Sequence, residues 1–252
     1  MNRLFTFVIL YILAVPFAQA GGGKIVLPEH DWTFDGVRGK FDRAQLQRGF
    51  QVYKEVCSTC HSLSLKSYRN LGDLGYSEDE IKAFASQFKV WDGPNDEGAM
   101  FERPALPSDR FVPPFPNANA ARAANNGAYP PDLSLIVKAR PGGADYLKAL
   151  LLGYSEAPAG FEVPNGIYYN KYFPGYKIAM AKPLDDGAVT YADGTPNTLD
   201  QMSSDVAAFL AWAAEPELEK RKETGVRVML FLVVFTGLLY LLKRQVWSKV
   251  EH

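Results

Sequence analysis

The segment CSTCH, from Cys57 to His61, is the feature that most constrains how this chain can fold. It contains both cysteines of the 252-residue chain and one of its three histidines. A disulfide across so short a loop restrains little of the unfolded chain. A structural zinc site needs about four ligands, and the sequence offers no second C-x-x-C. A thioredoxin-type motif follows a strand, whereas a helical pattern precedes this one.

The spacing C-x-x-C-H is typical of covalent attachment of a c-type haem. Two thiols add across the two vinyl groups of the porphyrin as thioethers, and one turn of chain between the sulfurs matches that separation. The histidine that follows is carried under the iron and becomes its proximal ligand. The motif therefore predicts one covalent haem c, bound through Cys57 and Cys60, with His61 on the iron.

The residues alone leave the sixth ligand of the iron open. A methionine thioether would raise the reduction potential and leave no position for a substrate. Met100 lies in a charged loop, whereas Met180 lies among apolar residues between a Pro-Gly turn and Pro183. A rigid, dry loop suits a weak ligand and favours Met180, while Met100 and bis-histidine ligation through His30 stay as alternatives.

The two ends of the chain have the patterns of targeting and anchoring segments. Residues 1–20 carry a basic residue, Arg3, near their start, continue as an apolar run and end in Ala-Gln-Ala, which predicts a cleaved signal peptide. Residues 225–242 include a long stretch without charge and predict a single transmembrane anchor. By the positive-inside rule, residues 243–252 form a cytoplasmic tail and residues 21–224 a periplasmic haem domain at the bacterial inner membrane.

Helical patterns dominate the segment between the two ends. Leu46, Phe50 and Tyr53 follow helical spacing after a capping residue at Asp42, so this helix would deliver the chain to Cys57. Further helices are expected over 77–88, 143–152 and 198–213. The strand signal is weak, and a proline-rich passage over 94–131 predicts long loops.

Several further segments resemble the cytochrome c1 family, which carries the haem of the cytochrome b–c1 complex (ubiquinol–cytochrome c oxidoreductase). They are QRGFQVYKEVCSTCHSL (47–63), WDGPNDEGAMFERP (91–104), ARAANNGAYPPDLS (121–134), KARPGGADY (138–146) and YFPGYKIAMAKPL (172–184). The resemblance covers nearly all of the chain. It implies a mostly α, cytochrome c-like haem domain with long loop insertions plus one C-terminal transmembrane helix.

The resemblance implies specific site residues. Met180 would be the distal ligand opposite His61. Arg140 and Tyr146 would contact a haem propionate, since a buried carboxylate needs a guanidinium or a hydroxyl.

Asn125 and Pro131 would line the pocket, and a prolyl carbonyl would orient His61 through its other ring nitrogen. Phe115 stands where the family frequently has a tyrosine, so one propionate contact lacks its hydroxyl. Some bacterial relatives carry a disulfide near the distal ligand, and this chain has no further cysteine. We therefore expect packing alone to hold the distal loop.

The resemblance also implies a role and partners. The protein would be an electron carrier, not an enzyme on its own, within a quinol–cytochrome c reductase of a proton-translocating electron transport chain. It would pass electrons from the Rieske iron–sulfur protein to a soluble or membrane-held cytochrome c. Cytochrome b and the lipid bilayer would be its other partners, in a dimeric complex. Two alternatives are a haem enzyme with an open distal position and a stand-alone membrane-tethered cytochrome.

The charge of the chain excludes one class of partner and suits another. The formal net charge of −1 leaves no basic excess for a nucleic acid. Residues 21–224 carry more acidic than basic side chains, which suits a basic protein partner. The acidic residues that could steer such a partner are Asp92, Asp96, Glu97, Asp185 and Asp186.

Overall fold

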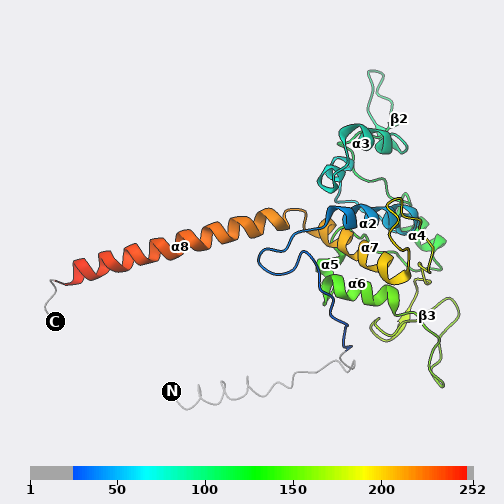
Figure 1. The fold of residues 1–252 in the computed structure, drawn as a ribbon. Coiled ribbons are helices and arrows are strands. Elements are labelled where there is room, and N and C mark those ends of the chain that lie inside the picture. Colours follow the sequence, from blue (N-terminus) through cyan, green and yellow to red (C-terminus); the bar gives the residue numbers. More distant parts are fainter. Residues whose placement is uncertain (1–24, 249–252) are drawn as a thin grey trace, which may run out of the picture.

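The computed structural model describes residues 25–248 (Figure 1). The predicted signal peptide, residues 1–20, and the last residues of the predicted tail, 249–252, lie outside this range. Residues 25–217 form a body of short helices and long loops, and one long helix projects from this body (Figure 1).

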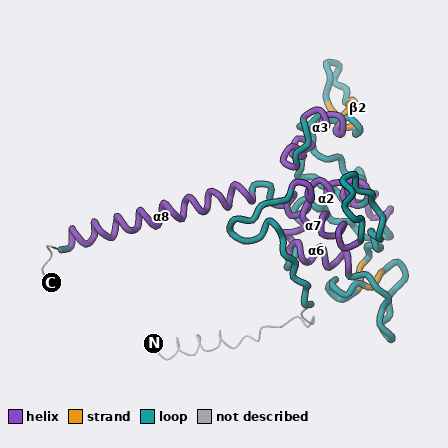
Figure 2. The backbone as a smooth tube through the Cα atoms, viewed as in Figure 1, coloured by secondary structure: helices purple, strands orange, loops and turns teal. Residues whose placement is uncertain are grey.

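Helices make up most of the regular structure. They are α2 (Arg43–Glu55), η1 (Cys57–Thr59), η2 (Tyr68–Leu74), α3 (Glu78–Ala85), α4 (Ala118–Ala124), α5 (Ile136–Ala139), α6 (Gly143–Leu152), α7 (Leu199–Ala214) and α8 (Leu218–Trp247). Within the described residues, strands occur as two antiparallel pairs. These are β1 (Lys89–Asp92) with β2 (Phe101–Pro104), and β3 (Tyr168–Tyr169) with β4 (Lys177–Ile178). Figure 2 shows long loops linking these elements. The predicted fold class is confirmed.

The helix starts follow the capping residues of the sequence. Asp42 Oδ1 accepts a hydrogen bond from the backbone N–H of Ala44 at the start of α2. Ser77 and Glu80 form a reciprocal capping box on α3. That helix ends at Ala85 rather than at residue 88, because Phe88 accepts a backbone hydrogen bond from Ala105 and leads into β1. Pairing with β2 therefore overrides local helix propensity at this point.

The core is organised by the crossing of α2 over α7. A Cβ at Gly49 of α2 would lie 2.0 Å from the carbonyl oxygen of Asp205 on α7, so only glycine allows this approach. Phe50 of α2 packs against Phe209 of α7 with ring centroids 5.6 Å apart. Helix α6 packs on another side of α7. Helix α7 is buried along nearly its whole length.

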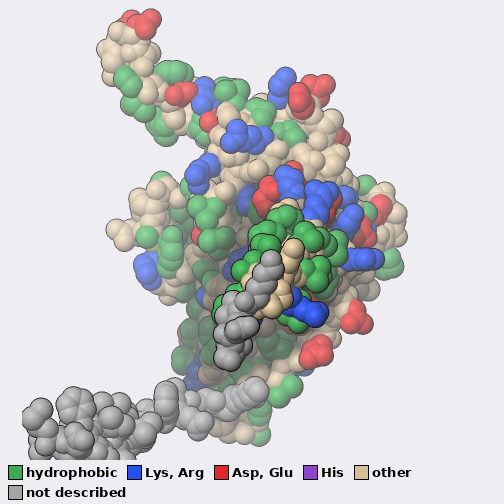
Figure 3. Space-filling view, turned by 90° about the vertical axis from the view of Figure 1, so that its left-hand side faces the viewer, with side chains coloured by type: hydrophobic (Ala, Val, Ile, Leu, Met, Phe, Trp, Pro, Cys, Tyr) green, Lys and Arg blue, Asp and Glu red, His purple; other side chains and the backbone are tan. Residues whose placement is uncertain are grey.

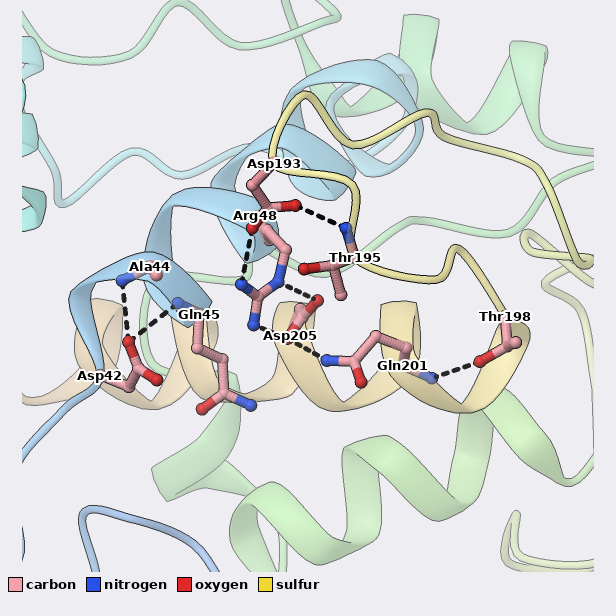
Figure 4. Close-up of polar contacts among 9 residues, drawn as sticks. All are labelled: Asp42, Ala44, Gln45, Arg48, Asp193, Thr195, Thr198, Gln201 and Asp205. Atoms are coloured by element: carbon pink, nitrogen blue, oxygen red, sulfur yellow. Dashed lines mark hydrogen bonds and ion pairs between the residues drawn. The ribbon is translucent and has the colours of Figure 1, made fainter.

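A polar network spans the same crossing (Figure 4). Arg48 of α2 donates from Nε to the carboxylate of Asp205, over 3.0 Å, and that carboxylate is fully buried. Arg48 Nη1 donates to Asp193 Oδ2, also over 3.0 Å, and Gln201 Nε2 donates to Asp205 Oδ1 over 2.9 Å. One guanidinium thus ties α2 to α7 and to the loop that precedes α7.

Helix α8 is the one described helix that is long and apolar enough to cross a membrane. It has 30 residues, and its most apolar window has a mean hydropathy of 2.2 with no part buried in the protein. At about 1.5 Å per residue it spans more than a ~30 Å hydrocarbon core. The helix is longer than the predicted span of 225–242 at both ends. The additional turns contain charged residues.

Candidate functional site

The C-x-x-C-H motif lies at the end of α2, as its sequence position predicts. The chain leaves α2 after Glu55 and tightens into η1, and the backbone N–H of His61 donates to the carbonyl of Cys57 over 2.9 Å. Both cysteines are free thiols and are half-buried. Burial raises the pKa of the Cys57 thiol to about 12. The attacking thiol of a catalytic C-x-x-C pair needs a lowered pKa, and burial shifts the pKa of Cys57 in the opposite direction.

The ring of His61 is oriented by one backbone carbonyl. Its Nδ1 lies 2.7 Å from the carbonyl oxygen of Pro131. Because a carbonyl can only accept, Nδ1 carries the proton and Nε2 keeps a lone pair that can bind a metal. Burial lowers the pKa of His61, and the Pro131 hydrogen bond opposes this effect only in part. The neutral imidazole that iron requires is therefore the favoured form.

Asp132 fastens the segment around Pro131 to the motif, a role that was not among the predictions from sequence. Its carboxylate accepts hydrogen bonds from Ser62 Oγ at 2.7 Å and from the backbone N–H groups of Ser64 and Ser134, each at 2.8 Å. Partial burial would raise the pKa of Asp132, but hydrogen bonds from Ser134, Ser64 and Ser62 outweigh it and hold the pKa at about 2. The sequence feature that could have indicated this role is an Asp directly after two prolines and two residues before a serine.

The loop that carries Met180 is hydrogen-bonded to the end of α6. Tyr154 Oη donates to the carbonyl of Met180 over 3.0 Å. Asn170 is fully buried, and its Nδ2 donates to the carbonyl of Leu150 over 2.7 Å. The Asn170 side chain also accepts from the backbone N–H of Tyr172 over 3.0 Å. The expectation that packing alone holds this loop was therefore wrong, because buried amide and phenol groups can bridge backbone segments as a disulfide would.

Arg140 directly follows α5, and its charge acts on Tyr146 of α6. Tyr146 of α6 is buried, which raises its pKa, while the nearby charge of Arg140 opposes the rise. Burial also raises the pKa of Tyr154, with Tyr146 as the next contributor. Arg140 is exposed, and its Nη1 donates to the adjacent carbonyl of Ala139 over 3.1 Å. Arg140 thus lies near Tyr146, and Tyr146 lies near Tyr154, whose hydroxyl donates to the Met180 carbonyl. A guanidinium and phenols are the groups that a carboxylate ligand would require.

Three more residues considered from the sequence are Asn125, Met100 and His30. Asn125 ends α4, where its Nδ2 donates to the carbonyl of Ala121 over 2.8 Å. Met100 is 56% exposed beside β2, at the opposite end of the body from β3 and its neighbouring loop (Figure 1). His30 Nδ1 lies 3.3 Å from Lys148 Nζ. Since Lys148 follows Tyr146 by two helical positions, His30 and Tyr146 lie on opposite faces of α6.

The donor set of the site fits a c-type haem. The residues predicted for the site supply two unpaired thiols, an imidazole with an oriented Nε2, a thioether whose backbone carbonyl accepts from Tyr154, and a guanidinium near a phenol. Residues 25–248 contain no cluster of three or more His, Cys, Asp or Glu side chains that could hold a metal ion.

Comparison with known proteins gives a consistent result. The model of the Cytochrome C1 family matches residues 32–250. The chain is 50% identical to cytochrome c1 of Rhodospirillum rubrum, over 93% of this chain and 92% of that protein. It is 52% identical to the mitochondrial cytochrome c1 heme protein of Schizosaccharomyces pombe, over 89% of this chain and 73% of that protein. It is also 50% identical to cytochrome b/c1 of Bradyrhizobium diazoefficiens, over 95% of this chain but only 38% of that longer protein. With a family model that covers most of its length, the chain belongs to the cytochrome c1 family.

Proposed function

We propose that this chain is the electron-transferring subunit of a ubiquinol–cytochrome c oxidoreductase, with one haem c bound covalently. The observation that carries the proposal is the 2.7 Å contact between His61 Nδ1 and the Pro131 carbonyl, which leaves Nε2 as a metal donor directly after a C-x-x-C pair. When bound, the haem supplies reversible one-electron exchange at iron. The protein is a carrier within the complex rather than an enzyme on its own.

Each site residue has a proposed task. Cys57 and Cys60 would form the thioethers, and His61 and Met180 would bind the iron. With two side chains bound, the iron would have no open position for a substrate, which separates a carrier from a peroxidase-type enzyme.

Four more residues complete the proposed pocket. Arg140 and Tyr146 bind a propionate, and Asn125 and Pro131 line the pocket. Tyr154, which braces the backbone of Met180, keeps the weak thioether in place.

The proposed partners are the Rieske iron–sulfur protein as donor, a soluble or membrane-held cytochrome c as acceptor, and cytochrome b beside the anchor in a dimeric complex. Of the acidic steering candidates, Asp92 is paired with Arg103, Asp185 with Lys182, and Asp186 accepts from the N–H of Leu199. A basic acceptor would therefore be steered chiefly by Asp96 and Glu97.

These last two residues lie in the turn between β1 and β2 and have no ion-pair partner among the described residues. Their charges remain available to a partner, and salt would screen them.

The proposed topology follows the segments of the sequence. The signal peptide over 1–20 is removed, residues 21–224 lie in the periplasm, residues 225–242 cross the inner membrane once, and residues 243–252 stay in the cytoplasm. The exposed apolar surface of α8 supports the anchor, because a helix of this hydropathy with no part buried needs an apolar surrounding.

The test compares two methionine variants. In Met180→Leu we expect haem that survives acid–acetone extraction, a lowered reduction potential, and carbon monoxide binding to the reduced protein at neutral pH. Leucine keeps the apolar volume but has no sulfur to donate to iron.

Met100→Leu is the matched control and should leave the potential unchanged, because Met100 is 56% exposed and lies away from the Met180 loop. An unchanged potential in Met180→Leu contradicts the ligand assignment. Loss of colour from the unmodified protein on extraction contradicts covalent attachment.

A further inference from the structure

A cavity of about 360 Å³ lies where α8 leaves the body. Its walls come from the loop over 34–36, from α5, from the end of α7 and from the first turn of α8. Phe34, Val137 and Leu218 supply apolar surface. The charged residues of the wall are Asp35, Lys138, Glu215, Arg221 and Lys222. No residue of the proposed haem site belongs to this wall.

The cationic side chains exceed the anionic ones by one in this wall. Glu215 bridges two of the cations, with Lys138 Nζ 2.9 Å from Oε2 and Arg221 Nε paired with Oε1. Lys222 Nζ donates to the backbone carbonyl of Phe34.

The side chain of Arg221 is hydrogen-bonded through its Nε alone among the described residues. Within the described residues, its two terminal nitrogens have no hydrogen-bond partner, and 61% of its side chain is exposed. The cavity therefore presents an open guanidinium edge beside apolar surface, which is the chemistry that a phosphate diester on a glycerol backbone would match.

The cavity is close to the level at which lipid headgroups would lie if α8 spans the membrane. Arg221 precedes Val228, the first residue of the uncharged run, by seven residues, which is about 10 Å of helix. The headgroup layer on each side of a bilayer is roughly 5–8 Å thick. The backbone of Arg221 would thus lie just outside that layer, and its long side chain could extend into it. Figure 3 shows Lys and Arg side chains gathered on the body around the base of the apolar helix.

We propose that this cavity binds the headgroup of an anionic phospholipid from the outer leaflet. The phosphate would lie against Arg221 and Lys138, and Asp35 would accept hydrogen bonds from headgroup hydroxyls. The apolar wall would cover the glycerol backbone. The lipid's charge of −1 balances the excess of one cation, so phosphatidylglycerol is the fitting probe. The inference rests on the proposed membrane anchor and is independent of the haem.

The experiment measures lipid binding to the full, haem-loaded chain in a neutral detergent. Phosphatidylglycerol is titrated and the bound lipid is counted by native mass spectrometry, with phosphatidylcholine and inorganic phosphate as comparison ligands. Arg221→Gln should weaken phosphatidylglycerol binding about tenfold, since it removes a charge-assisted hydrogen bond. Ala214→Leu, which fills the cavity and keeps every charge, should weaken it as well.

Lys220→Gln is the matched control. Lys220 precedes Arg221, carries the same charge, pairs with Glu217 at 3.0 Å and is absent from the cavity wall. Equal weakening by the Lys220 and Arg221 variants would overturn the proposal, as would no weakening by Arg221→Gln. Phosphatidylcholine binding as tight as phosphatidylglycerol binding, or full competition by inorganic phosphate at equal concentration, would do the same. The haem spectrum and potential, recorded on the same samples, report separately on the proposed electron-transfer function.

Discussion

The sharpest structural prediction concerns Gly49, at the crossing of α2 and α7. In Gly49→Ala the added Cβ would lie 2.0 Å from the carbonyl oxygen of Asp205, 2.6 Å from its carbonyl carbon and 2.7 Å from Phe209 Cβ. Two of these atoms belong to the backbone, so no side-chain rotation relieves the contact. The helices must move apart by about 1 Å or more, and overpacking of this kind costs roughly 1–3 kcal/mol or more.

We expect Gly49→Ala to lower the free energy of unfolding by about 3 kcal/mol. For a domain of this size that corresponds to a fall of roughly 6–12 °C in Tm, measured by circular dichroism of the haem-loaded protein in detergent. The displaced α2 also carries Cys57, so the covalent haem yield in cells should fall.

Gly72→Ala is the control, because the nearest atom to its added Cβ, Ile81 Cδ1, is 3.8 Å away. It should change the free energy of unfolding by less than about 1 kcal/mol. A Tm for Gly49→Ala within about 2 °C of the unmodified protein would refute the reasoning. It would show that the two helices can accommodate the added Cβ without cost, contrary to the distances at the crossing.

Two further predictions concern the braces of the site. Asp132→Asn should destabilise the protein at pH 7 by about 1–2 kcal/mol, because a carboxylate whose folded pKa is depressed to about 2 stabilises the fold above its unfolded pKa. The difference from the unmodified protein should vanish as the pH falls from about 4 to about 2, and a pH-independent difference in urea unfolding would show another cause. Asn170→Ala removes a fully buried side chain that bridges Leu150 and Tyr172, and should increase carbon monoxide binding to the reduced protein at neutral pH. Carbon monoxide binding equal to that of the unmodified protein would mean that the Met180 loop does not depend on this bridge.

The sequence predicted those parts of the structure whose signals are local. Asp42, Ser77 and Thr198 cap helices as their spacing indicates. C-x-x-C-H indicates the proposed attachment residues, because covalent attachment requires the two thiols and the histidine to lie close together in the sequence. Helix α8 follows from an uninterrupted apolar run.

The braces of the site could not be predicted in the same way, because they join segments that are distant in the chain. Asp132 reaches Ser62 across 70 residues, and Asn170 reaches Leu150 across 20. A buried Asn or Asp has the same local signature as a turn residue, and only the tertiary fold shows which backbone groups it serves. The early end of α3 was also unpredictable from local sequence. It depends on the hydrogen bond from Ala105 to Phe88, which forms because β1 pairs with β2.

Both halves of the proposed iron site depend on the crossing that contains Arg48 and Gly49. Helix α2 carries Cys57 at its end, and the loop that follows Met180 returns to the same helix, where Asp193 pairs with Arg48. Buried ion pairs such as Arg48–Asp205 contribute little net stability, because desolvation offsets much of the attraction. Their geometry is specific, however, since a guanidinium placed elsewhere would leave the fully buried Asp205 carboxylate without its ion-pair partner. We therefore infer that this pair selects one register of α2 on α7. In that register the crossing positions the end of α2, which carries the attachment motif, and through Asp193 it adds a second support to the segment after Met180, whose own loop is held by Tyr154 and Asn170.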